Sequence, residues 1–240
     1  MRRIKMTTLV ASGKTKELYT TDDSSVLRVH YTDHTTAGDG LRNELIENKG
    51  AVNNEISSMI FTYLNENGVD THFIERVNET DQLNKKVEMI PLEVVIRNFA
   101  AGHFQKRFGT DYLQTLKEPV VEFFYKDNDL HDPIVTKSDA IGLDLIEDDK
   151  LTQLEANGLK VNQILKGLFD KMNVTLVDFK LEFGINENGE IILADEISPD
   201  SCRLLDKDTN ESLDKDVFRK EAGDMMPGYL EILHRLRAAI

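Results

Sequence analysis

The chain has 240 residues, of which 40% are hydrophobic and 30% are charged, and its formal net charge is −14. This size and composition are typical of a globular protein that buries a large core as one domain or two lobes. Nucleic-acid-binding and membrane-surface proteins need a basic footprint, so the acidic balance argues against both kinds of partner. A local cluster of Lys and Arg could still bind a small anionic ligand.

The cysteine content and the hydropathy pattern indicate where the protein works. Cys202 is the only cysteine, so an internal disulfide cannot form and a reducing compartment is expected. The sequence has no apolar run near the roughly 20 residues that a membrane-spanning helix needs. The basic N-terminus is not followed by the apolar segment of a signal peptide. We therefore expect a cytoplasmic protein without membrane contact.

Short strand-like runs separated by Gly- and Asp-rich turns dominate the first part of the chain. A helix over 49–67 interrupts them, because its apolar residues keep helical spacing and Gly68 provides a C-terminal stop. The predicted strands are 7–10, 16–20, 25–31, 71–77, 85–90 and 92–99.

The second part of the chain combines longer elements, which are a strand over 120–125, a helix over 148–172, a strand over 176–184 and a helix over 229–238. Runs of strands with few helices, rather than regular βαβ alternation, predict an α+β fold with antiparallel sheets. The weakest connection falls near Pro91. It divides a β-rich N-terminal lobe, residues 1–90, from an α+β C-terminal lobe, residues 91–240.

The strand LVDFKLEFG (176–184) alternates strictly between apolar and charged residues. Period-two alternation predicts a strand with one buried face. Val177, Phe179, Leu181 and Phe183 form the apolar face, and Asp178, Lys180 and Glu182 form the other. The charged face either is solvated or lines an active site.

The turn after this strand predicts which residue faces Glu182. Asn188-Gly189 between two strand-like runs is typical of a two-residue type I′ hairpin. That register pairs Glu182 with Asp195, and it pairs Phe183 with Ala194. A longer turn would break this pairing.

Two carboxylates directly opposite each other on a hairpin repel unless a cation lies between them. Magnesium is a hard ion that binds one or two carboxylates together with water and substrate phosphates. Glu182 and Asp195 are therefore candidate magnesium ligands, with Lys180 on the same face facing a phosphate or carboxylate. The alternative is a solvated face with a loose ion pair.

Three further stretches contain candidate anion-binding residues. SGKTK (12–16) ends like a phosphate-binding P-loop, but residue 8 is Thr8 instead of glycine, which argues against a Walker-type site. In VIRNFAAGHFQKR (95–107), small residues beside an arginine would allow an anion to approach closely. SPDSCR (198–203) follows the candidate metal strand and supplies an acid and an arginine at a strand end, where binding groups are common.

The combination of motifs resembles phosphoribosylaminoimidazole-succinocarboxamide synthase, the SAICAR synthetase family of purine biosynthesis. The resemblance covers nearly the whole chain. It rests on GKTKELY (13–19), TAGDG (36–40), IPLEVVIRNFAAG (90–102), HDP (131–133), LVDFKLEFG (176–184) and ILADEISPDSCRLLDK (192–207).

The resemblance implies an ATP- and magnesium-dependent ligase that joins L-aspartate to the carboxylated ribonucleotide CAIR, releasing ADP and phosphate. It also implies a two-lobed fold similar to the ATP-grasp and kinase-like architectures, with a small antiparallel lobe over a larger α+β lobe and ATP in the cleft between them. A homodimer is suggested in the same way.

The resemblance assigns roles to individual positions. The positions near the nucleotide are Gly13, Lys14, Lys16, Met89 and Lys126. Those associated with magnesium are Glu182 and Asp195. Those facing the ribonucleotide and the reacting carboxylate are Asp39, Arg97, His103, Asp132, Asp178, Lys180, Asp200 and Arg203. Of these, Lys180, Asp178 and Asp132 are the candidate catalytic residues; the sequence does not choose a general base among Asp132, Asp178 and Asp200.

His103 departs from the family pattern, which has a phosphate-contacting serine at this position, so an imidazole N–H would have to replace the hydroxyl. Two other functions use the same ATP site. A small-molecule kinase would stop at phosphoryl transfer, and a nucleotide sensor would keep the fold without catalysis. ADP release that requires aspartate distinguishes the ligase from both.

Overall fold

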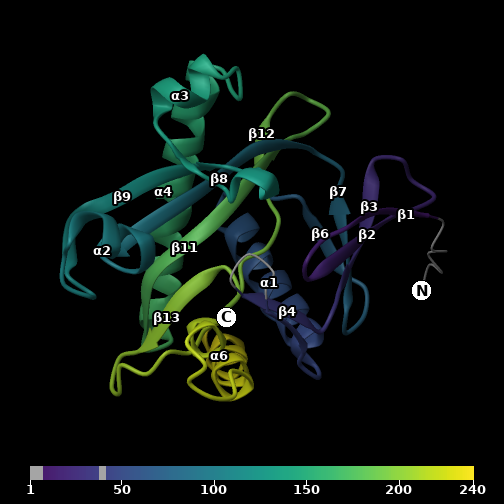
Figure 1. The fold of residues 1–240 in the computed structure, drawn as a ribbon. Helices are drawn as coiled ribbons and strands as arrows, with labels where there is room; N and C mark the ends of the chain where they lie inside the picture. The colour runs from purple at the N-terminus through teal and green to yellow at the C-terminus, as the bar shows by residue number, and fades with distance from the viewer. Residues whose placement is uncertain (1–7, 38–41) are drawn as a thin grey trace.

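The computed structural model describes residues 8–37 and 42–240. These residues form a mixed α+β fold in which two antiparallel sheets lie side by side and the helices pack against them (Figure 1). Asp39 and the first residue of the strand predicted over 7–10 lie outside the described residues. In the part of the chain that is described, no helix is long and apolar enough to cross a membrane.

The smaller sheet has five strands in the order β1-β2-β3-β7-β6. Their bounds are β1 Leu9–Ser12, β2 Lys16–Thr20, β3 Val26–Tyr31, β6 Phe73–Arg76 and β7 Asp81–Lys85. A separate two-stranded ribbon consists of β4 His34–Ala37 and β5 Arg42–Leu45.

The larger sheet has six strands in the order β10-β9-β8-β11-β12, and β13 pairs with β11 beyond that path. Their bounds are β8 Glu88–Phe99, β9 Thr115–Tyr125, β10 Ile134–Val135, β11 Val174–Ile185, β12 Ile191–Ala194 and β13 Cys202–Asp206. β11 is therefore the central strand, with β8 on one side and both β12 and β13 on the other. Side chains on its charged face therefore lie beside residues of β8 on one side and of β12 or β13 on the other.

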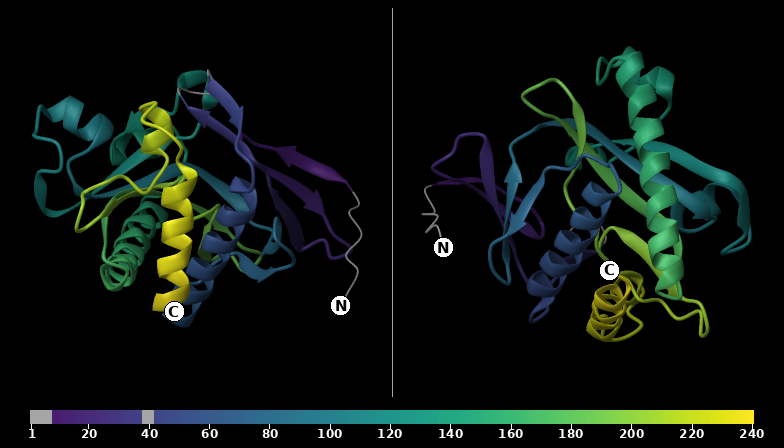
Figure 2. Two further views of the ribbon diagram at one scale, coloured as in Figure 1. Left: turned by 90° about the horizontal axis from the view of Figure 1, so that it is seen from below. Right: turned by 180° about the vertical axis from the view of Figure 1, so that it is seen from behind.

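The predicted helices are confirmed with small shifts at their ends. α1 is Lys49–Glu66, α4 is Asp148–Lys171 and α6 is Met226–Ala239. The shorter helices are α2 Gly102–Phe108, η1 Asn128–Leu130, α3 Lys137–Gly142 and α5 Asp216–Arg219. α4 covers one face of the larger sheet, and α1 packs beside α6 (Figure 2).

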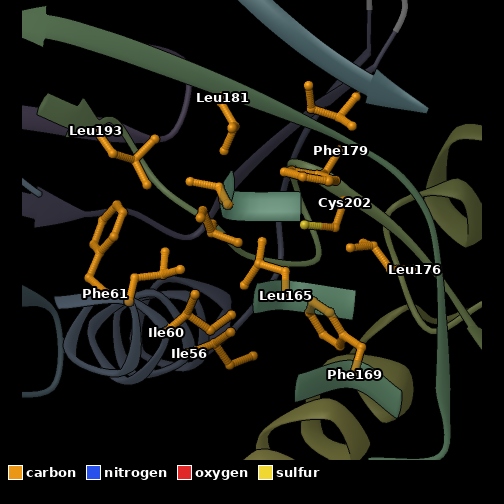
Figure 3. Close-up of a cluster of buried hydrophobic side chains, with 14 of the residues drawn as sticks. Ile56, Ile60, Phe61, Leu165, Phe169, Leu176, Phe179, Leu181, Leu193 and Cys202 are labelled. Atoms are coloured by element: carbon orange, nitrogen blue, oxygen red, sulfur yellow. The ribbon is translucent and has the colours of Figure 1, made fainter. Parts of the chain in front are cut away.

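The main core lies between α1, α4 and the apolar face of the larger sheet (Figure 3). Ile56 and Ile60 of α1, Leu165 and Phe169 of α4, and Phe179 of β11 are at most 1% exposed. Fully burying one such side chain contributes about 1.5–3 kcal/mol relative to leaving it exposed. The core therefore fixes β11 rigidly in the middle of the molecule, where its opposite face can position polar groups.

The apolar face of β11 differs from the predicted one at its beginning. A register shift against β13 between Leu176 and Asp178 changes which residues face the core. Leu176 packs into the main core, whereas Val177 packs into a separate small cluster with Ala101 and Leu205. Of the predicted apolar face, Phe179, Leu181 and Phe183 pack into the main core, and Val177 does not.

The predicted two-residue turn is wrong, and the strand register changes with it. Glu182 pairs with Ala194 and Ile185 with Ile191, and Asn186 N donates to Glu190 O, so the turn between the strands has three residues, 187–189. Gly189 has φ +80°, but Asn188 is not among the residues with positive φ. A type I turn followed by a left-handed glycine is the usual three-residue hairpin. A type I′ turn would have required positive φ at both positions.

The strands predicted over 85–90 and 92–99 are instead the end of β7 and one continuous strand, β8. Pro91 lies inside β8, and the whole of β8, from Glu88, belongs to the larger sheet. A lobe boundary at 90 and 91 stays a prediction. The two sheets are joined where Leu193 of β12 bridges Thr71, with His72 N donating to Leu193 O at 2.8 Å.

Candidate active site

The charged face of β11 lies beside a second charged face on β8. In the ladder between the two strands, Asp178 pairs with Arg97 and Glu182 pairs with Glu93. Glu182 is thus directly opposite a carboxylate, but that carboxylate is Glu93 and not the predicted Asp195. Like charges directly opposite on a sheet destabilise it unless a cation compensates them.

Lysine side chains supply that compensation. Lys180 Nζ contacts Glu182 Oε1 and lies 2.9 Å from Asp195 Oδ2 and 3.6 Å from Glu93 Oε1. Lys126 Nζ contacts the other oxygen of Glu182. Lys16 Nζ, from β2 of the smaller sheet, lies 2.5 Å from Asp195 Oδ1. We call the residues Lys126, Glu182, Lys180, Asp195 and Lys16 the lysine–carboxylate row.

Asp195 reaches this row by an irregular backbone conformation. It is the first residue after β12 and has φ +61°, in the left-handed region that aspartate tolerates better than most residues. The strand therefore ends at Ala194. Asp195 lies outside the hydrogen-bonded strand pair, and its carboxylate contacts Lys180 from there. The predicted proximity of Glu182 and Asp195 holds through the shared lysine, although the predicted cross-strand pair does not.

The ionisation of this row is governed by mutual charge. Burial alone would lower the pKa of Lys16, but the Asp195 and Glu196 carboxylates outweigh it and raise that pKa above its usual value. Burial likewise opposes the charge of Asp195, yet Lys16 and Lys180 hold the pKa of its carboxyl well below the usual range. Burial raises the pKa of Glu93. The carboxylates likewise raise the pKa of Lys180, so Lys16 and Lys180 stay cationic at neutral pH.

A second set of ion pairs crosses four neighbouring strands of the same sheet. Arg97 Nε donates to Glu122 Oε2 at 2.6 Å and Arg97 Nη1 to Asp178 Oδ2 at 2.7 Å. Arg203 Nη1 also donates to Asp178 Oδ2, at 2.8 Å. Arg107 contacts the other oxygen of Glu122. We call Arg107, Glu122, Arg97, Asp178 and Arg203 the arginine row.

The position of the Arg203 side chain requires a glycine at residue 102, the last residue of Ala100-Ala101-Gly102. Gly102 has φ +57°, and a Cβ on it would lie 2.8 Å from Nη2 of Arg203. The Arg203 guanidinium therefore packs against the first residue of α2, which brings His103 to the same place. Burial would lower the pKa of Arg203, but Asp178 and Asp216 raise it further above its already high value.

Two cavities adjoin these rows. The inner cavity has a volume of about 320 Å³ and is lined by Lys180 together with Arg97, Asp178 and Arg203 of the arginine row. The outer cavity has a volume of about 610 Å³ and is lined in part by Asp132. Glu93, Val95 and His103 line both, so the two cavities adjoin each other. The predicted residues that line the inner cavity are Arg97, His103, Asp178, Lys180, Asp200 and Arg203.

Asp200 lies at the wall of the inner cavity, but its carboxylate is already satisfied. Lys49 Nζ donates to Asp200 Oδ2 at 2.8 Å, and Tyr229 Oη donates to Oδ1 at 2.6 Å. Burial opposes its ionisation, yet Lys49 and Lys215 hold the pKa of Asp200 well below the usual range. These contacts fix the loop between β12 and β13 against α1 and α6.

The other predicted nucleotide residues lie apart from the two rows. Gly13 and Lys14 are exposed in the turn between β1 and β2, which Gly13 N closes by donating to Lys16 O at 2.8 Å. Met89 is 42% exposed on β8, next to Gly184 in the ladder. Asp39 lies outside the described residues.

Glu93, Glu122 and Lys49 belong to the site but were not predicted from the sequence. Glu93 could have been found, because period-two spacing places it on the same strand face as the predicted Arg97, four residues away. Glu122 and Lys49 had no such signal. Their partners lie 25 and 151 residues away along the chain.

The donor set suits a magnesium ion that also binds substrate oxygens. Glu182 and Asp195 offer hard carboxylate oxygens close enough for one ammonium, Lys180, to contact both. Within residues 8–37 and 42–240, no group of three or more His, Cys, Asp or Glu side chains is arranged to hold a metal alone. An ion bound by one or two carboxylates would complete its shell with phosphate and water, as magnesium usually does.

The combined geometry favours an anionic ligand with two charged ends. Of the two arginines that contact Asp178, Arg203 is the more exposed, with 23% of its side chain accessible against 5% for Arg97, and Lys180 is similarly accessible at 24%. A ligand in the inner cavity could place a phosphate against Arg203 and a carboxylate against Lys180. The lysine–carboxylate row lies at the far end, where a second polyanion could meet that carboxylate.

This fold and site define an α+β protein that binds multiply charged anionic substrates between rows of buried ion pairs. A model of the family described as SAICAR synthetase matches residues 9–236. The chain belongs to the SAICAR synthetase family.

Individual relatives agree with this membership. The phosphoribosylaminoimidazole-succinocarboxamide synthase of Pediococcus pentosaceus is 50% identical over 233 residues, which cover 97% of this chain and 96% of that protein. The solved synthase from Ehrlichia chaffeensis matches with a TM-score of 0.94 at 41% identity, covering 97% of this chain and 99% of that one. A SAICAR synthetase solved in complex with ADP matches with a TM-score of 0.92 at 43% identity, covering 95% and 97%.

Proposed function

We propose that the protein joins L-aspartate to the 4-carboxylate of the ribonucleotide CAIR, converting ATP to ADP and phosphate and forming SAICAR. The observation that carries the proposal is the family match over residues 9–236. The inner cavity supports it, because Lys180, Arg97 and Arg203 line a space that a ribonucleotide with a phosphate and a carboxylate would occupy.

The chemistry explains why this many cations are needed. A carboxylate is a poor electrophile, so transfer of the γ-phosphoryl group of ATP to one of its oxygens makes an acyl phosphate with a good leaving group. The amine of aspartate then attacks the carbonyl carbon, the C–O bond to phosphate breaks, and the amine loses a proton. ATP, CAIR and aspartate are all anions, so catalysis consists largely of positioning them and offsetting their repulsion.

We assign the protein groups as follows. Arg203 and Arg97 hold the 5′-phosphate, with His103 beside them at the start of α2. Lys180 holds the reacting carboxylate, and Asp178 keeps the two arginines in place. Lys16, Lys14 and the Gly13 turn approach the ATP phosphates, Met89 contacts the adenine, and Lys126 lies on the nucleotide side of Glu182.

Glu182 and Asp195 would hold magnesium, which supplies charge neutralisation between the phosphoryl group and the carboxylate. Lys180, which contacts both carboxylates, is then available to the substrate. ATP would lie between the β-rich residues 1–90 and the residues 91–240 that contribute the substrate and metal groups. Asp39 belongs to the same proposal as a substrate-side residue.

The testing experiment measures ADP release from ATP, magnesium and CAIR with each amino acid in turn. We expect release only with L-aspartate, together with SAICAR formation. Release without any amino acid would identify a kinase, and ATP binding without release would identify a nucleotide sensor. Asp195→Asn should lower turnover at least 100-fold and shift the magnesium concentration for half-maximal rate, while circular dichroism stays unchanged. An unchanged magnesium dependence would refute the metal assignment.

Two wider expectations accompany the proposal. A reducing cytoplasm suits a protein whose one cysteine, Cys202, is buried and whose thiol pKa is raised by burial to a value far from physiological pH. A homodimer is expected from the family resemblance and is tested by analytical ultracentrifugation.

A further inference from the structure

Lys49, the first residue of α1, is buried, and no step of the proposed reaction uses it. Its side chain is 0% exposed, and a buried ammonium is unfavourable unless other groups pair with it. Lys49 Nζ donates to two acceptors, His34 O of β4 at 2.7 Å and Asp200 Oδ2 at 2.8 Å. One lysine therefore joins α1, the two-stranded ribbon and the loop between β12 and β13.

The carboxylate of Asp200 lines the inner cavity but is held by two residues that do not. Asp200 is part of the cavity wall, whereas Lys49 and Tyr229 are not among the residues that line it. Tyr229 of α6 is 0% exposed, and its Oη donates to Asp200 Oδ1 at 2.6 Å, so each carboxylate oxygen has a donor. A carboxylate can accept about four hydrogen bonds. Asp200 can therefore accept more from a ligand in the inner cavity, in directions that Lys49 and Tyr229 determine.

The backbone of the loop that carries Asp200 is fixed by other contacts. Lys180 N of β11 donates to Ser201 O at 2.9 Å, and Lys215 N donates to Pro199 O at 3.1 Å. These bonds hold the loop at the cavity wall on both sides of residue 200. Loss of the buried lysine would therefore change the direction of the carboxylate much more than the position of the backbone.

The charge of Asp200 has a second source of compensation. Burial opposes its ionisation, and Lys49 and Lys215 together lower the pKa of its carboxyl below the usual range. Lys215 stays in place when Lys49 is replaced. Lys49→Met keeps a long side chain, so it removes a directional donor but leaves Asp200 with one nearby cation.

The orientation of this carboxylate matters because CAIR is an anion. CAIR carries a phosphate and a carboxylate, and Asp200 would repel both. It also carries amino and hydroxyl groups, which can donate hydrogen bonds to a carboxylate. A fixed Asp200 carboxylate stabilises the complex when its free lone pairs face those donors, whereas a mobile one would also meet the anionic oxygens.

We propose that Lys49 and Tyr229 are positioning residues for the ribonucleotide, which direct the Asp200 carboxylate toward the N–H and O–H groups of CAIR. The inference rests on the proposed function, because that function places CAIR in the inner cavity. Neither residue touches the ligand, so both act through Asp200.

The test is steady-state kinetics on Lys49→Met and Tyr229→Phe, with all three substrates varied. The KM for CAIR should rise at least tenfold in Lys49→Met and at least threefold in Tyr229→Phe, which loses only a hydroxyl group. The KM values for ATP and L-aspartate should stay within twofold of the wild type. Ile232→Val, at another buried position of α6, is the matched control. It should lower the Tm but leave the KM for CAIR unchanged.

Thermal unfolding separates positioning from a purely structural role. A lower Tm with no change in the KM for CAIR, or an equal rise in all three KM values, would show that the two residues only stabilise the fold, and would overturn the proposal. Tyr229→Phe keeps its ring in the core, so it tests the proposal even if Lys49→Met does not fold.

Asp200→Ala tests whether the two residues act through the carboxylate. In an Asp200→Ala background, adding Lys49→Met or Tyr229→Phe should change the KM for CAIR less than twofold, because the effects of residues that act through one group are not additive. Equal fold-changes in both backgrounds would show an independent route and overturn the proposal. A wild-type protein that forms no product with CAIR and L-aspartate would instead refute the proposed function.

Discussion

Glu122 offers the sharpest test of how the arginine row is held. It is 5% exposed, and its two carboxylate oxygens accept from Arg97 Nε, at 2.6 Å, and from Arg107. Glu122→Gln keeps one acceptor oxygen but turns an amide NH₂ toward a guanidinium. One hydrogen bond to a charged group is lost, which costs about 1.5–3 kcal/mol, and the negative charge between two arginines is removed.

Because Arg97 keeps Asp178 as a partner, we expect the lower part of the range for a broken buried pair, about 3 kcal/mol. For a chain of this length that corresponds to a Tm lowered by about 6–12 °C. Arg97 should also be less well positioned, so the KM for CAIR should rise about tenfold, equivalent to about 1.4 kcal/mol of binding, without a change in the KM for ATP.

Urea unfolding and steady-state kinetics measure the two effects separately. Glu118→Gln is the matched control, because Glu118 is an exposed residue of the same strand, β9. Its free energy of unfolding should stay within about 0.5 kcal/mol of the wild type. An equally small change in Glu122→Gln would show that the buried contacts of Glu122 contribute nothing to stability. Equal changes in the KM values for CAIR and ATP would refute a local role at Arg97.

Two further substitutions test local features. Gly102→Ala should raise the KM for CAIR at least tenfold, because its Cβ would lie 2.8 Å from Arg203 Nη2. Gly109→Ala is the control: Gly109 has a similar φ of +63° and nothing within 4 Å, so the substitution should cost only about 1–2 kcal/mol of stability. Equal KM values for CAIR in both variants would contradict this prediction. Burial raises the pKa of Asp214 from 3.8 to about 6, so the protonated form is favoured in the folded state. Its contribution to stability is therefore present below about pH 4 and is lost as the pH rises through 6, by about 1–3 kcal/mol. In urea unfolding between pH 4 and pH 7, Asp214→Asn should remove that part of the pH dependence, and parallel profiles for both proteins would refute it.

The local pattern of the sequence determined the elements and the two faces of β11. Side chains alternate along a strand with period two whatever the strand pairs with, so Asp178, Lys180 and Glu182 share a face as predicted. The long helices followed in the same way from apolar spacing. The motif combination identified the family, because those stretches retain their order over nearly the whole chain.

The sequence did not determine the register of the hairpin. Asn188-Gly189 is compatible with a two-residue turn and with a three-residue turn, and the choice depends on whether Asn188 adopts positive φ. A change of one residue moved the partner of Glu182 from Asp195 to Ala194. The two acids still meet at Lys180, because Asp195 adopts a left-handed conformation that strand periodicity does not encode.

Only the tertiary structure decided which charges meet across long sequence separations. Lys16 reaches Asp195 from the other sheet, Lys49 neutralises Asp200 from α1, and Glu122 joins Arg97 to α2. From the sequence alone, a charged residue is expected to be exposed to solvent, since burying an unpaired charge costs free energy. Packing of the sheets and helices brings the charged partners together, and their pairing offsets the free-energy cost of burying them. The two rows that form the site therefore exist only in the folded chain.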